Sequence, residues 1–104
     1  MDVGAQTALP PSVQADLLKS KIVDAVKAGK TDVAMKLIRD FHGLEAQGIN
    51  VPQPLLLFEA KEYHKRSEEV PAFDVLTKYL NAPKQSDQEY SVALRLYEEL
   101  ESNP

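Results

Sequence analysis

Apolar side chains recur along this chain at steps of three and four residues, which is the spacing of one face of an α-helix. The first such pattern runs from Val13 to Val26 and the second from Ala34 to Leu44. Three more follow, so the pattern predicts helices over residues 13–28, 31–47, 54–67, 71–80 and 87–101. No segment alternates apolar and polar residues over the length of a strand. The sequence therefore predicts an all-α fold of about five helices.

Glycine, proline and small polar residues mark where these helices begin and end. Ser12 is expected to cap the first helix through its hydroxyl. Gly29 fits a left-handed stop after that helix, and Thr31 opens the next one. Gly48 closes the second helix, with Gly43 as an earlier stop. These stops predict short turns, and hence helical hairpins.

The chain aligns with itself after a shift of 38 residues, which brings Ala34 onto Ala72 and Gly29 onto Ser67. Apolar positions of the second predicted helix fall on apolar positions of the fourth. One alanine in each hairpin leaves room for its two helices to approach closely. The sequence thus predicts two copies of one antiparallel helical hairpin.

The first copy is expected over residues 13–47 and the second over 54–81. The stretch "YSVALRLYEEL" (90–100) repeats only the second helix of the hairpin. It is therefore predicted to be a C-terminal capping helix. Residues 1–11 are predicted to be a flexible lead-in, and residues 12–104 a single domain of common size.

This pattern resembles the tetratricopeptide repeat, a helical hairpin with a period of about 34 residues. The second hairpin matches the spacing of that family's small, aromatic, alanine and large positions with Ala60, Tyr63, Ala72 and Leu76. The first hairpin matches it more loosely with Ile22, Ala25, Gly29, Ala34 and Ile38. The spacing of 38 is longer than the family's, Phe41 and Tyr79 replace its last alanine, and only two full repeats are present. The resemblance implies a right-handed stack of the two hairpins, capped by the fifth helix.

Two further resemblances concern parts of the chain. Residues 17–101, with "LLLFEA" and "ALRLY", look like a helical segment of bacterial envelope and multidomain proteins. Such segments usually accompany another domain. The "AGKTDVA" stretch is similar to pentatricopeptide repeats, but an RNA-binding repeat is expected to be basic. Here the net charge is −4.

The composition narrows the partners that this chain is expected to have. A mildly acidic protein is a poor binder of nucleic acid and of anionic membranes. The longest apolar run is four residues, "LLLF", whereas a membrane span needs roughly 20, so no membrane insertion is expected. The chain has no cysteine, which leaves its compartment open between the cytoplasm and, for a product of an exported precursor, the periplasm. Its oligomeric state is equally open.

The residues that could carry chemistry do not form a known catalytic pattern. His42 and His64 are the only histidines, and they lie on different predicted helices without metal-binding spacing. The four glycines are scattered, so no phosphate-binding loop is present. We therefore expect no enzyme activity, no cofactor and no metal. A small metal-dependent enzyme and an RNA-binding module using "KEYHKRS" stay as alternatives.

One set of residues supports a hypothesis about binding. In tetratricopeptide-like stacks the first helix of each hairpin lines a concave face. The resemblance assigns the following positions to that face: Lys19, Val23, Lys27, Leu57, Lys61, His64 and Lys65. Such a basic groove would suit an acidic peptide or a terminal carboxylate, although lysines on the solvent side of a helix are equally ordinary.

The expected function is accordingly a non-enzymatic module for protein–protein interaction or assembly, binding a peptide or partner domain through a helical groove. The alternative of the same kind is a structural or dimerisation spacer within a larger protein.

Overall fold

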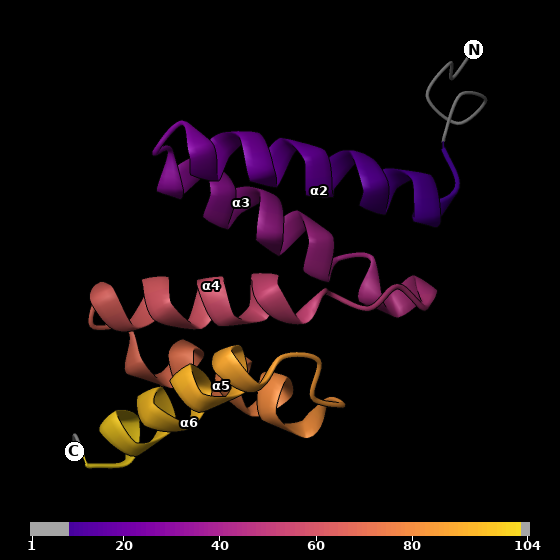
Figure 1. Ribbon diagram of the computed structural model, residues 1–104. Coiled ribbons are helices and arrows are strands. Elements are labelled where there is room, and N and C mark those ends of the chain that lie inside the picture. The colour runs from indigo at the N-terminus through magenta and orange to yellow at the C-terminus, as the bar shows by residue number, and fades with distance from the viewer. Residues whose placement is uncertain (1–8, 103–104) are drawn as a thin grey trace. The chain divides into compact units, whose positions relative to one another are not determined.

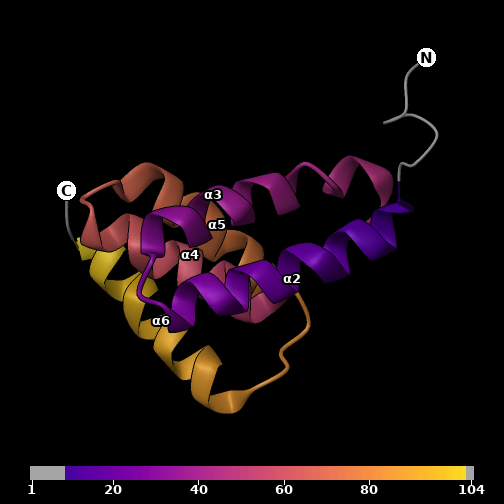
Figure 2. The same cartoon turned by 90° about the horizontal axis from the view of Figure 1, so that it is seen from above.

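The computed structural model describes residues 9–102, and every regular element in that range is a helix (Figure 1). The elements are α2 (Pro11–Lys27), α3 (Thr31–His42), the 3-10 helix η1 (Glu45–Gln47), α4 (Gln53–Lys65), α5 (Glu69–Asn81) and α6 (Asp87–Ser102). The predicted all-α class and number of α-helices are therefore confirmed within the described range. Figure 2 shows the same helices from above.

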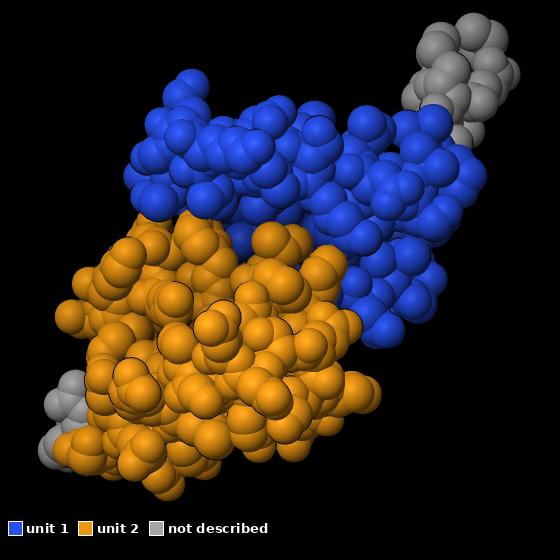
Figure 3. Space-filling view, viewed as in Figure 1, with its two compact units in different colours: residues 1–51 blue, residues 52–104 orange. Residues whose placement is uncertain are grey.

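The chain divides into two compact units, Met1–Val51 and Pro52–Pro104, coloured separately in Figure 3. The first holds α2, α3 and η1, and the second holds α4, α5 and α6. Most of the predicted lead-in, residues 1–8, lies outside the described residues, and α2 already begins at Pro11. The single domain over 12–104 and the right-handed stack stay predictions.

In the first unit α2 and α3 form a hairpin closed by a Schellman turn. The amide of Lys30 donates to the carbonyl of Ala25 at 2.9 Å, and the amide of Gly29 donates to Val26 at 3.0 Å. Gly29 has φ +73°, the left-handed conformation that the sequence predicts for it. α3 ends at His42, earlier than Gly48, because Gly43 and the 3-10 turn after it interrupt the α-helix. The predicted cap at Ser12 is wrong, since Pro10 precedes the helix and no side chain caps it.

The predicted apolar stripe of α2 is buried only in part, at Ile22 and Ala25. Val13, Leu17 and Val26 are exposed, whereas the buried residues are Ala15, Ile22 and Ala25. α2 is apolar on two sides, so spacing alone did not decide which side is covered. On α3 the predicted face is mostly correct, with Ala34, Ile38, Phe41 and, beyond the helix, Leu44 buried.

In the second unit α4 and α5 form a hairpin with the same type of turn. The amide of Glu68 donates to Tyr63 at 2.8 Å and the amide of Ser67 donates to His64 at 3.0 Å. Pro71 lies in the first turn of α5, where its lack of an N–H leaves no helical bond unmade. The two predicted hairpins are therefore both present, one in each unit.

Helix α6 packs against both α5 and α4. Near its start, Glu89 bonds to Tyr79 at the end of α5. Near its end, the ring of Tyr97 lies 4.9 Å from that of Phe73, at the start of α5. α6 therefore runs antiparallel to α5 and in the same direction as α4. Its buried residues, Ala93, Leu96 and Leu100, belong to the predicted apolar face, whereas Val92 is exposed.

Candidate functional site

The seven residues assigned to the binding face divide between the two units. Lys19, Val23 and Lys27 are exposed residues of α2, in the first unit. Leu57, Lys61, His64 and Lys65 follow one another on α4, in the second unit, at the spacing of one helix face. The candidate site therefore centres on the four residues of α4.

Leu57 and Lys61 line a cleft between α4 and α6 with a volume of about 250 Å³. Its apolar wall consists of Pro54, Leu57 and Phe58 from α4 and Val92 from α6. The polar side chains of Lys61 and Glu89 also line it. Apolar walls with a few placed polar groups are the composition typical of binding sites.

The two charged groups of this cleft differ in their partners. The carboxylate of Glu89 accepts a hydrogen bond from the buried Tyr79 hydroxyl. Burial, reinforced by the Glu89 charge and this hydrogen bond, raises the pKa of Tyr79 above its ordinary value of 10.0. Lys61, by contrast, is an exposed side chain with no ion pair among the described residues. The cleft is therefore apolar, with one carboxylate bonded to a neutral phenol and one ammonium group without an ion pair among the described residues.

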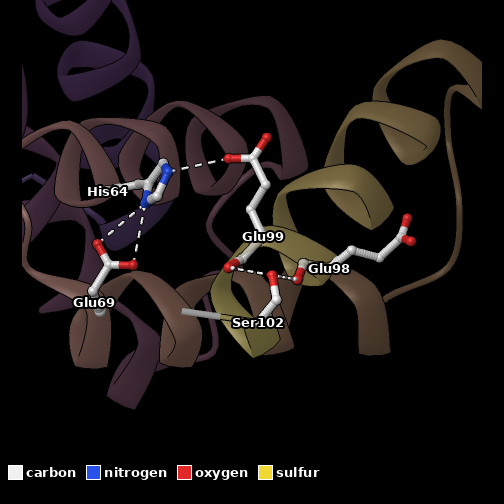
Figure 4. A network of polar contacts seen from close by, with 5 residues as sticks. All are labelled: His64, Glu69, Glu98, Glu99 and Ser102. Carbon is white, nitrogen blue, oxygen red and sulfur yellow. Dashed lines mark hydrogen bonds and ion pairs between the residues drawn. The ribbon is translucent and has the colours of Figure 1, made fainter. Parts of the chain in front are cut away.

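His64 lies farther along the same face of α4 and connects all three helices of the second unit (Figure 4). Its Nδ1 lies 3.1 Å from Oε1 and 3.2 Å from Oε2 of Glu69, on α5. Its Nε2 lies 3.2 Å from Oε2 of Glu99, on α6. The ring is thus occupied by carboxylates of its own chain.

Lys65 also has a partner within α4, because its Nζ donates to Oε2 of Glu62 at 3.1 Å. The Lys65 side chain is 71% exposed and that of Glu62 only 9%, so the lysine supplies the partner of a largely buried carboxylate. Of the four predicted residues on α4, Leu57 and Lys61 meet in the cleft, whereas His64 and Lys65 are engaged in ion pairs beyond it.

The segment before α6 fixes the start of that helix. The Ser86 hydroxyl accepts the Glu89 amide hydrogen at 3.3 Å. Lys84 donates to Asp87 at 2.9 Å and lies 5.4 Å from the centre of the Tyr90 ring. The hydrogen bond from Lys84, followed by its charge, lowers the pKa of Asp87. Asp87 and Glu89 both lie in the first turn, where negative charge favours the helix.

The contribution of α6 was not predicted. Glu89, Val92 and Glu99 lie at helical spacing on one face of that helix, and this face meets α4 at both the cleft and His64. The helical spacing of these three residues can be recognised in the sequence. The spacing alone does not show which neighbouring helix an exposed face will contact.

A second cleft, of about 440 Å³, lies in the first unit between α2 and α3. Ala25, Val33 and Leu37 form its apolar part, and Lys21 and Lys30 are among its polar residues. Neither Lys19 nor Lys27 lines it. It therefore offers no support for the predicted role of those two lysines.

Two other kinds of site were sought over residues 9–102. No group of three or more histidine, aspartate or glutamate side chains there is arranged to hold a metal ion. No helix in that range is both long and apolar enough to cross a bilayer.

Comparisons with protein-family models, with curated proteins and with solved structures found no match to this chain.

Proposed function

We propose that this chain is a non-enzymatic protein-interaction module that binds a partner through the cleft between α4 and α6. The observation that carries the proposal is that Leu57 and Lys61, both assigned to partner binding from the repeat pattern, line one cleft. Leu57 is buried and Lys61 is exposed, so the pair combines an apolar floor with a charged rim. Interaction sites commonly combine these two features.

The ammonium group of Lys61 favours an acidic partner. Glu89 is bonded to Tyr79, which leaves Lys61 as the group able to pair with a ligand. A peptide would place an apolar side chain against Phe58 and Val92 and a carboxylate beside Lys61. The carboxylate is either an acidic side chain or the peptide's own C-terminus, and charge-assisted hydrogen bonds of this kind are stronger than neutral ones.

A peptide library selected on the full-length chain tests this function. We expect enrichment of sequences in which an apolar residue lies next to an acidic one. Selected peptides would then be titrated against Val92→Glu, which puts a charge into the apolar wall, and Lys61→Glu, which reverses the available charge. Each change is expected to weaken binding by about tenfold, the scale of a lost charge-assisted contact or of a charge placed in an apolar wall.

Two matched variants serve as controls. Leu94→Glu adds the same charge on α6 at a residue that is 41% exposed, against 37% for Val92, and that does not line the cleft. Lys36→Glu reverses an exposed lysine on α3. Peptides that bind the wild type and all four variants alike would contradict the proposal, as would selection of basic peptides.

A structural or dimerisation spacer is the second candidate, and the outer side of α2 favours it. Val13, Leu17, Val23 and Val26 are between 38% and 48% exposed, and exposed apolar groups on one helix are typical of helix–helix assembly. Sedimentation equilibrium separates the candidates. A dimer that Leu17→Glu converts to a monomer supports the spacer, whereas a monomer at all concentrations opposes it.

A further inference from the structure

The contacts of His64 with two carboxylates require a particular protonation state of its ring. Carboxylate oxygens accept hydrogen bonds and cannot donate them, and a neutral imidazole carries only one N–H. Yet the two ring nitrogens of His64 face two different carboxylates, Glu69 through Nδ1 and Glu99 through Nε2 (Figure 4). Both contacts are favourable only when the ring is an imidazolium, because its Nδ1–H then donates to Glu69 while its positive charge attracts the Glu99 carboxylate 3.2 Å from Nε2.

We propose that His64, Glu69 and Glu99 form a protonation-dependent latch that holds the end of α6 to α4 and α5. With two protons the ring donates to Glu69 and carries the positive charge that pairs with Glu99. After one proton leaves, the ring can donate to only one of them, and the lone pair of the other nitrogen then faces negative oxygen. Glu69 is the first residue of α5, directly after the α4–α5 turn, so the chain itself keeps it near the ring. Glu99 reaches the ring from a separate helix. The contact with α6 is therefore the one that is lost.

Two glutamates are in contact with the ring. Glu69 is the charged group that faces His64 from α5, and Glu99 is the one that faces it from α6. On α4, the neighbouring Lys65 is held by Glu62 at 3.1 Å. The carboxylate of Glu98 points away from the ring (Figure 4), and the Ser102 hydroxyl bonds the backbone carbonyls of Glu98 and Glu99.

Imidazole side chains as a class change charge between about pH 5 and pH 8, so the latch is tested across that range. The latch therefore predicts that α6 is held more firmly below neutral pH than above it. The His64 side chain is 28% exposed and that of Glu99 is 59% exposed, so the effect is a local opening of one helix end rather than unfolding. The latch lies on the same contact between α4 and α6 as the cleft, but it requires no partner.

Backbone amide hydrogen exchange on the full-length chain tests the latch. We expect protection of the last two turns of α6, corrected for intrinsic exchange, to be about two- to fivefold higher near pH 5.5 than near pH 8, the scale of a partly exposed ion pair. Glu99→Gln is expected to abolish this difference, because an amide does not repel the neutral ring as a carboxylate does. His64→Gln is expected to abolish it as well.

His42→Gln is the matched control. His42 is the other histidine, and its Nδ1 lies 2.7 Å from Glu45 only three residues away, in the first unit. Its loss is expected to leave the pH response of α6 unchanged. Equal protection of α6 at both pH values, or a pH response that persists in Glu99→Gln, would overturn the latch. Because the readout is α6 itself, failure of the peptide-binding proposal would leave this result intact.

Discussion

Gly29 and Ser67, which are 38 residues apart, hold the same left-handed backbone conformation, with φ of +73° and +60°. Each lies between the two helices of a hairpin. The residues that follow them also agree, since Lys30 has φ −92° and ψ 72° and Glu68 has φ −95° and ψ 74°. The two hairpin turns are therefore the same turn, although only one of them contains a glycine.

This relationship predicts that Ser67→Gly stabilises the protein. A left-handed conformation costs a residue with a Cβ about 1–2 kcal/mol, and glycine pays no such penalty. We expect the free energy of unfolding to rise by about 1 kcal/mol. The measurement is urea denaturation followed by circular dichroism.

The reverse change gives the counterpart of that prediction. Gly29→Ser is expected to lower the free energy of unfolding by about 1 kcal/mol. A Cβ at Gly29 would have no atom within 4 Å, so backbone strain is the cause. Ser20→Gly, at an exposed site within α2, should destabilise the helix instead. A stabilising effect at Ser20, or none at Ser67, would show that the left-handed conformation is not what matters.

Because the pKa of Tyr79 is raised in the folded protein, we expect the protein to lose stability at alkaline pH. Burial and Glu89 raise this pKa, so the native state keeps a proton that the unfolded chain loses. This contribution is complete below the unfolded pKa of about 10 and is lost as the pH rises through the folded value. We expect Tyr79→Phe to lose less stability than the wild type between about pH 9 and pH 11. In absorbance titrations at the tyrosinate band, Glu89→Gln should move the Tyr79 transition to lower pH; an unmoved transition would argue against a role for Glu89.

We expect a large loss of stability when the side-chain amide of Gln53 is replaced by a carboxylate. This side chain is buried, and its Nε2 donates to the backbone carbonyl of Tyr79 at 3.1 Å. Gln53→Glu replaces the donor with an oxygen facing a carbonyl, so we expect a loss of about 1–3 kcal/mol near neutral pH. The loss should shrink in acid, where the carboxyl group is protonated. Gln47→Glu, at an exposed site in η1, is the control and should change stability by less than about 0.5 kcal/mol.

A substitution at Ala72 tests how closely α4 and α5 are packed in the second hairpin. Ala72 has no exposed surface, and neither has Ala34, the residue that corresponds to it in the first hairpin. We expect Ala72→Leu to lower the free energy of unfolding by about 1–3 kcal/mol, because the added atoms force the helices apart. Ser91→Leu, at an exposed position of α6, should have little effect. If both variants unfold at the same urea concentration, the alanine does not limit the approach of α4 and α5.

The helices and turns were predictable because their signals are local. Gly29 stops one helix, Pro71 fits the first turn of another, and the face of α3 with Ile38 and Phe41 is its main apolar face. The buried face of α2 was not predictable in this way. Leu17 and Ile22 lie on different sides of that helix, and the larger share of its apolar residues proved to be the exposed one.

Only the α4 side of the candidate site could be predicted from the sequence. The repeat pattern selected Leu57 and Lys61, which do line the cleft. It did not select Val92, because the choice of α6 as the opposite wall depends on how the last helix packs, which is a long-range relationship. It also could not foresee that Glu59 and Glu62 are buried, since periodicity assigns charged residues to the solvent side.

Residues 82–86 join α5 to α6 without helical structure, and Pro83, Lys84 and Gln85 in this stretch are exposed. A single protease cut between Lys84 and Gln85 would thus sever the backbone while leaving α4, α5 and α6 whole. Whether the released C-terminal fragment then stays bound depends on its non-covalent contacts alone. The nicked protein would behave as a fragment-complementation pair, with the dissociation constant of the two pieces measuring the strength of that packing.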